Sequence, residues 1–254
     1  MRAKIETIIR HTFINNLDKD SVVVDLGANK GDFSKGVAEK AGCSRIILVE
    51  GNPGLARELE SSFRGQGHFS VVSAVMGGQA RAHVSFYLSG SPGSSSLRES
   101  FTGPDLKREI KTKMITLKDI FSMFGLVKID LLKMDVEGAE WDVFEKFSKE
   151  DFDRIEQITV EFHDFKDPSS RRRTEGAIDK MKGLGYCFVN KTSGYRFKAP
   201  YKDCLFYKRG YRLLVLTRSL RDLADAVLRD IFKLPFWVFN RLNPGRRRPN
   251  PDKK

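Results

Sequence analysis

The strongest constraint on the fold is a buried-strand pattern that runs directly into a glycine-containing turn. Residues 22–26 are apolar and β-branched apart from Asp25 and Leu26, which is typical of a strand that is buried on both faces of a parallel sheet. Gly27 and Gly31 follow at once, and residues 32–41 have the pattern of a helix. Such a turn directs free backbone N–H groups into the adjoining crevice, where they favour an anion or a polar ligand.

The rest of the pattern alternates strands with helices, which predicts an α/β fold with a mainly parallel sheet. The further strands are expected at residues 46–50, 69–75, 83–88, 113–116, 129–135, 155–161, 186–190 and 203–208. The further helices are expected at residues 53–63, 116–124, 139–147 and 172–184. The last two strands can pair as an antiparallel hairpin. The loop from Ser89 to Ser96 is rich in Gly and Ser, as in a loop that is mobile or wraps a ligand.

Two terminal segments flank this unit. Residues 1–19 are expected to form a lead-in helix, because apolar side chains recur there at helical spacing, at Ile5, Ile8, Ile9, Phe13 and Leu17. Residues 20–208 then form the main domain, and residues 209–254 form a basic, amphipathic tail.

The net charge of +12 belongs mainly to that tail. From Lys208 onward, 13 Lys or Arg face 4 Asp or Glu, whereas the preceding residues carry 32 against 29. Leucines three or four positions apart beside basic and aromatic side chains suit an anionic membrane surface, so residues 211–254 are a candidate membrane contact. Docking on the main domain, oligomerisation and nucleic-acid contact remain alternatives, and the oligomeric state stays open.

The three cysteines form no C-x-x-C pair, which favours a reducing compartment. The sequence also lacks the apolar stretch of a signal peptide and the roughly 18 apolar residues that cross a bilayer. We therefore expect a cytoplasmic protein, peripheral on the inner membrane surface if the tail binds there.

The glycine loop and the end of the next strand together indicate the ligand. A dehydrogenase has G-x-G-x-x-G, but here the spacing is Gly27-x-x-x-Gly31, with Asn29 where a second glycine would admit a pyrophosphate. Glu50 ends the second strand, where its carboxylate can bind both ribose hydroxyls. An adenosine ligand without a diphosphate is indicated, and S-adenosylmethionine is the candidate. The expected cofactor contacts are Asp25, Gly27, Asn29, Gly31, Glu50 and Asp135.

A second group of polar residues follows the fourth and fifth strands. Asp135 and Glu137 end the fourth strand, and Glu161 and His163 end the fifth, so all four should face the same crevice. We expect His163, Asp135 and Glu161 to act in catalysis and Glu137 with His163 to bind substrate. A histidine with a pKa near 6.5 can remove a proton from a hydroxyl, although a hydrogen bond within the loop is the alternative role.

We assign no metal ligands from the sequence, and no Cys or His cluster has zinc-like spacing. Asp135, Glu161 and His163 would nevertheless form an oxygen-rich cation site if they converge.

The chain resembles the FkbM family of methyltransferases. The matching segments are Val24 to Gly31, Val49-Glu50, Ile115 to Asp119, Leu132 to Glu140 and Val160 to His163. The resemblance covers residues 20–208 and implies a class I methyltransferase fold, which is Rossmann-like, with a seven-stranded sheet, an antiparallel last strand and helices on both faces. It also implies O-methylation of a hydroxyl.

The predicted function is S-adenosylmethionine-dependent methylation, with a sugar, a glycan, a lipid-linked molecule or a natural product as acceptor. An RNA methyltransferase that uses the basic tail is an alternative. Against it, the fourth strand ends in Asp135-Val136-Glu137-Gly138 rather than in an Asn-Pro-Pro-Tyr type of motif that holds a flipped base, so nucleic acid is disfavoured. A non-catalytic, membrane-tethered binding module is a second alternative.

Overall fold

The computed structural model describes residues 4–90, 95–102, 106–192, 201–208 and 210. The chain divides into two units after Arg209, and the second unit lies outside the described residues apart from Gly210. The predictions for the tail, including its contact with a membrane surface, therefore stay predictions.

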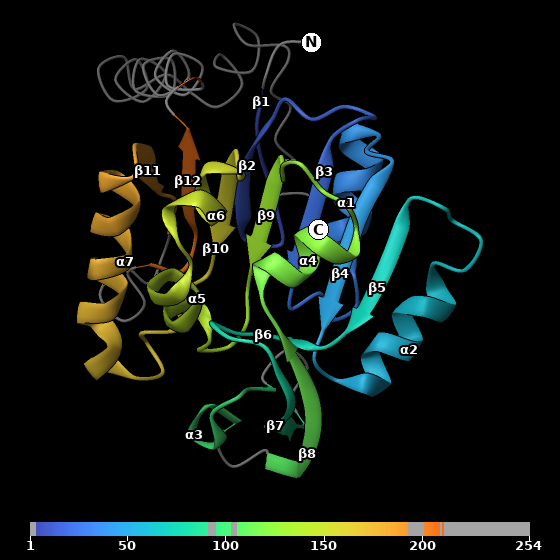
Figure 1. Ribbon diagram of the computed structural model, residues 1–254, viewed down its shortest axis with the longest axis vertical. Coiled ribbons are helices and arrows are strands. Elements are labelled where there is room, and N and C mark those ends of the chain that lie inside the picture. The colour runs from blue at the N-terminus through green and yellow to red at the C-terminus, as the bar shows by residue number, and fades with distance from the viewer. Residues whose placement is uncertain (1–3, 91–94, 103–105, 193–200, 209, 211–254) are drawn as a thin grey trace, which may run out of the picture. The chain divides into compact units, whose positions relative to one another are not determined.

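A seven-stranded sheet forms the centre of the first unit (Figure 1). Its strands, in spatial order, are β11 (Tyr186–Asn190), β12 (Cys204–Lys208), β10 (Gln157–Val160), β9 (Leu131–Met134), β3 (Val22–Leu26), β4 (Arg45–Glu50) and β5 (Phe69–Ser73). The last strand, β12, is antiparallel to both of its neighbours, and the pairs from β10 through to β5 are parallel. This arrangement confirms the predicted class I methyltransferase sheet.

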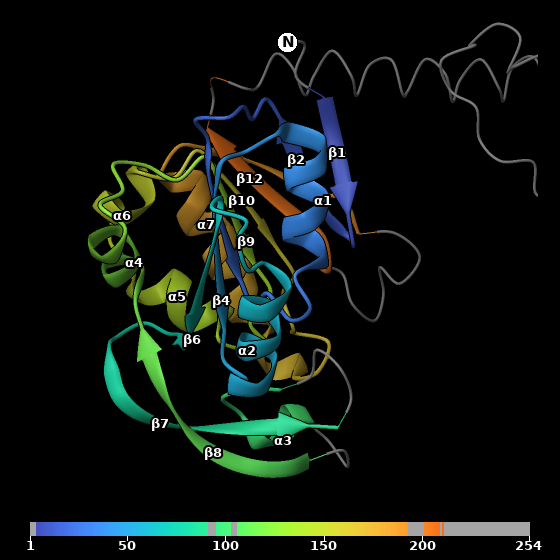
Figure 2. The same cartoon turned by 90° about the vertical axis from the view of Figure 1, so that its right-hand side faces the viewer.

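Helices cover both faces of the sheet, as Figure 2 shows. The helices are α1 (Asp32–Ala41), α2 (Pro53–Ser62), α4 (Leu117–Met123), α5 (Glu140–Lys146), α6 (Lys149–Asp153) and α7 (Arg171–Gly183). Val22 and Val24 pack in the same cluster as α4 to α7, whereas Val23 packs with α1 and α2. Because side chains alternate along a strand, a continuous apolar run supplies both cores.

The predicted lead-in helix is wrong, because the described part of this segment is a β-hairpin. Strand β1 (Lys4–Ile8) pairs antiparallel with β2 (His11–Asn15). The segment is rich in Ile and Thr, whose branched side chains favour strands, and the spacing of its isoleucines fitted either structure. Phe13 is fully buried against the α1 side of the sheet, so the segment still covers the core as expected.

A smaller sheet lies at the carboxyl ends of the parallel strands (Figures 1 and 2). It comprises β6 (Val75–Met76), β8 (Leu106–Ile115) and β7 (Arg81–Ser89), with the short helix α3 (Glu99–Thr102) beside it. A 3₁₀ turn, Pro168–Ser170, precedes α7. The expected strand at residues 69–75 is divided between β5 and β6. The chain therefore leaves the central sheet after Ser73, and its next strand, β6, belongs to the smaller sheet.

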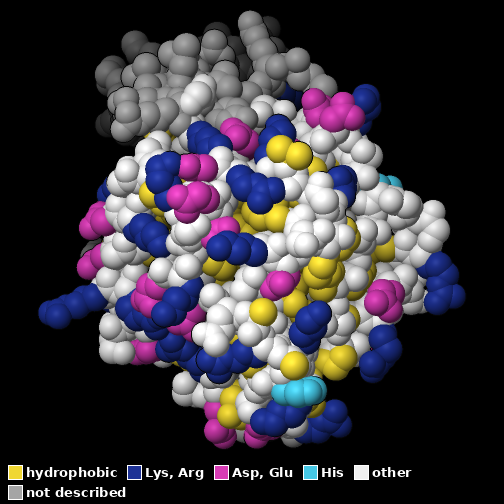
Figure 3. Space-filling view, viewed as in Figure 1, with side chains coloured by type: hydrophobic (Ala, Val, Ile, Leu, Met, Phe, Trp, Pro, Cys, Tyr) yellow, Lys and Arg dark blue, Asp and Glu magenta, His cyan; other side chains and the backbone are white. Residues whose placement is uncertain are grey.

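Lys and Arg side chains are interspersed with Asp and Glu on the face shown in Figure 3. This mixture agrees with the near balance of charge before Lys208. Among the described residues, no helix is long and apolar enough to cross a membrane.

Candidate active site

A cavity of about 620 Å³ opens where β3, β4 and β9 end against the smaller sheet. Its polar wall includes Asn29, Glu50 and Asp135, and its apolar wall includes Leu55 and Phe86. We call it the donor cavity. Four residues that the sequence predicted as cofactor contacts line it, namely Gly27, Asn29, Glu50 and Asp135.

Glu50 is fixed in the donor cavity by backbone hydrogen bonds. The N–H groups of Asn29 and Asn52 each donate to one of its carboxylate oxygens at 2.8 Å. Burial raises the pKa of Glu50, and these two hydrogen bonds oppose the rise. Each oxygen retains a lone pair, so the carboxylate can still accept hydrogen bonds from a pair of ribose hydroxyls.

Gly27 brings the ends of β3 and β9 together. Its φ is +74°, and a Cβ atom at this position would lie 1.8 Å from the carbonyl oxygen of Asp135. No other residue fits such an approach. Gly31 has a different constraint, because its Cβ would lie 2.9 Å from the side chain of Leu59 in α2.

Asp25 and Gly31, also predicted as cofactor contacts, are not among the residues that line the donor cavity. Asp25 is fully buried, accepts a hydrogen bond from the Ser34 hydroxyl at 2.7 Å, and lies 3.0 Å from the ammonium group of Lys133. Lys133 donates in turn to the carbonyl oxygen of Gly27 at 2.6 Å. Asp25 thus stabilises the glycine loop, and direct contact with the cofactor stays a prediction.

Lys133 is a buried cation that the sequence reasoning did not assign to the site. Burial disfavours its charge, but Asp25 and then Asp135 raise its pKa, so it stays charged. Its position among the apolar residues of a four-residue buried strand could have indicated this role, because a lysine buried there requires a carboxylate partner.

A second cavity, of about 910 Å³, adjoins the first and is strongly charged. We call it the acceptor crevice. The two cavities share four lining residues, Gly27, Asn29, Asp135 and Glu137. Glu161 and His163, which the sequence predicted for the crevice, line it as well.

Both ring nitrogens of His163 face carboxylates. Nδ1 lies 2.9 Å from Glu140, and Nε2 lies 3.3 Å from Glu137 and 3.7 Å from Asp135. Burial lowers the pKa of His163, but Glu140 and Glu137 together raise it well above the usual 6.5. Carboxylates accept hydrogen bonds, so this environment favours the imidazolium form with N–H on both nitrogens.

Glu140 organises the loop that carries Asp135 and Glu137. Its fully buried carboxylate accepts hydrogen bonds from the backbone N–H groups of Val136 at 3.1 Å and Gly138 at 3.0 Å, in addition to its contact with His163. Glu137 itself has a φ of +52°, which a non-glycine residue rarely adopts. The loop is therefore held in one conformation.

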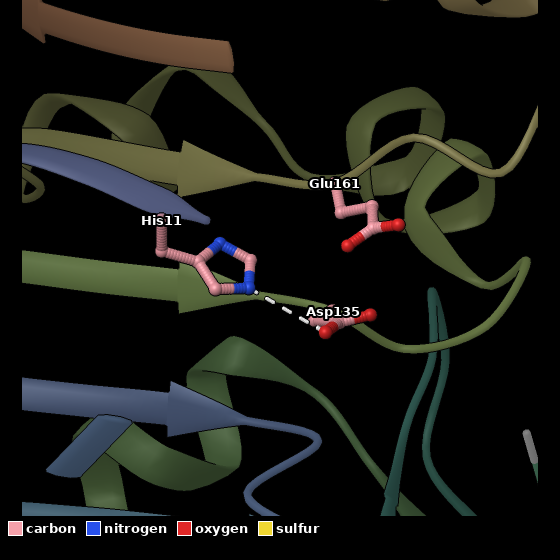
Figure 4. A group of neighbouring side chains, drawn as sticks. All are labelled: His11, Asp135 and Glu161. Carbon is pink, nitrogen blue, oxygen red and sulfur yellow. Dashed lines mark hydrogen bonds and ion pairs between the residues drawn. The ribbon is translucent and has the colours of Figure 1, made fainter. Parts of the chain in front are cut away.

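The hairpin supplies His11, which sequence reasoning missed. Nε2 of His11 lies 3.4 Å from Asp135 Oδ2, and Figure 4 shows the ring directed toward that carboxylate. Burial raises the pKa of Asp135, but Lys133, followed by His11, lowers it far below the usual range, so Asp135 is ionised. No signal in the sequence indicated this contact, because His11 lies in a segment that was predicted to be a packing helix.

The crevice also contains basic side chains from distant parts of the sequence. Lys166 lies 2.5 Å from Glu137, and Lys202 lies 3.2 Å from Glu161, where Arg10 is 3.8 Å away. The carboxylates of the crevice are thus paired with cations, which spacing along the chain could not indicate.

From the sequence, Asp135, Glu161 and His163 were a candidate cation site, but the structure does not bring these three together as one group of ligands. Instead, the ligand atoms fall into two groups that share Asp135, one with His11 and Glu161, the other with Glu137 and His163. Within each group the atoms lie within 4.8 Å of one another.

The polar and apolar groups that line the donor cavity fit S-adenosylmethionine. Asn29 has a φ of +51°, and its buried side-chain oxygen has no hydrogen-bond partner among the described residues. A ligand ammonium or hydroxyl group can satisfy such an acceptor. Apolar Leu55 and Phe86 can contact an adenine ring, and Glu50 can bind its ribose.

Known proteins resemble this chain over the same region. The family model described as Methyltransferase FkbM domain matches residues 25–188. The methyltransferase FkbM of Streptomyces tacrolimicus, named for 31-O-demethyl-FK506, is 39% identical over 90 residues, which cover 34% of this chain and 31% of that protein.

Two further relatives match longer stretches. The AMB antimetabolite synthetase AmbE of Pseudomonas aeruginosa is 26% identical over 204 residues, which cover 67% of this chain and 10% of that protein. Methyltransferase 1 of Beauveria bassiana is 27% identical over 202 residues, covering 68% of this chain and 79% of that protein. The chain therefore spans about a tenth of AmbE and about a third of FkbM.

Proposed function

The chain belongs to the FkbM-domain methyltransferases, and from this premise we propose that it transfers the methyl group of S-adenosylmethionine to a hydroxyl oxygen. The proposed acceptor is a sugar, a glycan, a lipid-linked molecule or a natural product. The observation that carries the proposal is the pair of adjoining cavities that share Asp135, one with a ribose-binding carboxylate and one with charged side chains. The relative FkbM is named as a methyltransferase of 31-O-demethyl-FK506, which supports a hydroxyl acceptor.

On the donor side, the residues of this chain bind the methyl donor and orient it. Glu50 accepts hydrogen bonds from the ribose hydroxyls, and the oxygen of Asn29 accepts from the amino-acid part of the donor. When bound, S-adenosylmethionine supplies an electrophilic methyl group on a sulfonium. Alignment of that methyl group with the acceptor oxygen accounts for much of the rate, because the transfer is an in-line displacement.

On the acceptor side, Glu137 and His163 bind the acceptor, and His163 takes up the hydroxyl proton at Nε2. Only the neutral ring can accept that proton, so the reactive form arises when the imidazolium loses its Nε2 proton. Glu140 keeps the other nitrogen protonated and fixes the ring by the 2.9 Å contact with Nδ1. Asp135, which is ionised, stabilises positive charge between the two cavities.

Calorimetric titration with S-adenosylmethionine tests the donor site. We expect Glu50→Ala to weaken binding at least about tenfold, because hydrogen bonds to a charged group contribute roughly 1.5–3 kcal/mol each. Glu58→Ala is the matched control, since Glu58 is an exposed carboxylate on α2, and it should bind as the wild type does. Absence of binding by the wild type, or equal binding by Glu50→Ala, contradicts the proposal.

The acceptor can be sought in cells that lack the gene. Mass spectrometry of their glycans, lipids and small metabolites should show molecules that have lost one methyl group, and re-expression of the wild type should restore it. Restoration by Glu50→Ala to the same extent would argue against donor binding through Glu50.

A further inference from the structure

We propose that His11, Asp135 and Glu161 form a binding site for a divalent cation of the Mn²⁺ or Mg²⁺ type. Figure 4 shows these side chains converging from β2, from the loop after β9 and from the end of β10. Their ligand atoms lie within 4.8 Å of one another. His11 comes from the hairpin and lies outside residues 25–188, which the family model matches, whereas Asp135 and Glu161 lie within them.

The charge of the three side chains complements a divalent ion. His11 and Glu161 are 2% and 3% exposed, so their polar atoms obtain little solvation from water. Bound to an ion, two carboxylates and one imidazole nitrogen supply two negative charges, and carboxylate-rich sites favour Mg²⁺ and Mn²⁺. A bound ion would replace the hydration that these buried groups lack.

The contact between His11 and Asp135 is too long for a strong hydrogen bond. His11 Nε2 lies 3.4 Å from Asp135, and the nearest cation to Glu161 is Lys202 at 3.2 Å. By contrast, the carboxylate of Asp203, which contacts the same hairpin, accepts a hydrogen bond from Thr12 at 2.7 Å. Two ligands bound to one ion at about 2.1 Å lie roughly 3 Å apart at right angles, so the 3.4 Å between His11 and Asp135 suits a shared ion.

The hairpin holds His11 firmly in place. Asp203 accepts hydrogen bonds from both the backbone N–H and the hydroxyl of Thr12, the next residue. Gln157 bonds to both backbone groups of Ile14, at 2.8 and 2.9 Å. A ligand on so well anchored a strand is preorganised for binding.

The neighbouring cations can make room for the ion. The side chains of Arg10 and Lys202 are 65% and 28% exposed, so each can turn toward solvent. Lys133 is buried, but it lies closer to Asp25, at 3.0 Å, than to Asp135, at 4.0 Å.

The alternative group of Asp135, Glu137 and His163 is less open to an ion. Lys166 lies 2.5 Å from Glu137, and both nitrogens of His163 already face carboxylates. An ion at the His11 group displaces only longer contacts. We therefore assign the ion to His11, Asp135 and Glu161.

The site also has a consequence that rests on the proposed function. Because Asp135 lines both cavities, the ion lies beside the junction of donor and acceptor. A cation there can bind the acceptor hydroxyl and lower its pKa, as metal ions do for bound water.

The test is titration of the chelator-treated 254-residue chain with Mn²⁺ alone, followed by electron paramagnetic resonance of the free ion. We expect one Mn²⁺ per chain, binding weakened at least tenfold in His11→Gln and in Glu161→Gln, and competition by Mg²⁺. Asp32→Asn removes an exposed carboxylate from the same crevice and should leave the affinity unchanged. Thermal melting of each variant verifies that it is folded.

Failure of the wild type to bind Mn²⁺ overturns the site, and so does unchanged binding by folded His11→Gln and Glu161→Gln. Binding that is lost in His163→Gln but retained in His11→Gln also overturns it, since the other group would then hold the ion. Parallel titration with S-adenosylmethionine separates this result from failure of the proposed function.

Discussion

The donor cavity and the acceptor crevice share a wall but satisfy their polar groups in different ways. In the donor cavity, backbone N–H groups hold Glu50 at 2.8 Å, and apolar side chains surround it. In the acceptor crevice, side chains from distant parts of the sequence face one another, and several contacts, such as His11 with Asp135 at 3.4 Å, are long.

In the proposed function, this difference separates binding of the donor from the chemistry on the acceptor. Backbone groups move little, so the donor cavity presents a fixed shape to a constant ligand. Side chains such as Lys166 and Lys202 can rearrange, which allows the crevice to adapt to an acceptor and to a change in protonation. Lys133 contacts both regions, because it bonds to the loop of the donor side and lies 4.0 Å from Asp135.

Lys133→Met should have the largest effect, because it affects both cavities at once. Removal of the buried ammonium leaves Asp25 without its ion-pair partner, and breaking a buried pair costs about 3–5 kcal/mol. Chemical denaturation measures the free energy of unfolding. Lys182→Met is the control, since it removes an exposed ion pair with Asp179 and should change stability by less than about 1 kcal/mol. Equal effects of the two variants would show that the buried ion pair of Lys133 with Asp25 contributes no more to stability than the exposed pair does.

Gly27→Ala should have the next largest effect. A Cβ atom there would meet the carbonyl oxygen of Asp135, and the residue has a positive φ. We expect a loss of about 2–4 kcal/mol from strain and overpacking, with weaker binding of S-adenosylmethionine. Gly67→Ala is the control, because no atom lies within 4 Å of the added Cβ. Normal donor binding by a folded Gly27→Ala variant would mean that this close approach does not shape the cavity.

The smallest expected effect concerns the acceptor side alone and depends on pH. Because the pKa of His163 is raised well above 6.5, kcat/KM for methyl transfer should increase as pH rises above neutrality and the reactive neutral ring accumulates. Donor affinity should change less over the same range. A rate that falls with rising pH would instead assign His163 a role as a fixed cation.

The same shift makes a prediction for stability. A folded-state pKa above the unfolded value contributes stability that is complete below about pH 6.5 and is lost as pH rises through the folded-state pKa. The free energy of unfolding should therefore decrease with rising pH more steeply in the wild type than in His163→Gln. Parallel pH profiles would show that the two carboxylates do not hold the imidazolium.

The sequence by itself determined the central sheet and the donor side. Residues 22–26 are apolar enough to be buried on both faces, and Gly27 and Glu50 lie at the ends of successive strands. Parallel neighbours place such ends side by side, so short-range pattern was sufficient. The same rule brought Asp135, Glu161 and His163 to one crevice.

Only the tertiary structure decided which partners these groups have. The spacing of the isoleucines in residues 3–17 fitted a helix, but the segment forms a hairpin whose strand β2 bonds to Gln157 and Asp203 through side chains. Those contacts join residues more than a hundred positions apart, and local propensity contains no information about them. For the same reason, the pairing of His163 with Glu140 and the approach of His11 to Asp135 could not be read from spacing. Protonation of the crevice depends on these long-range contacts, because burial and charge at a given atom are set by everything folded around it.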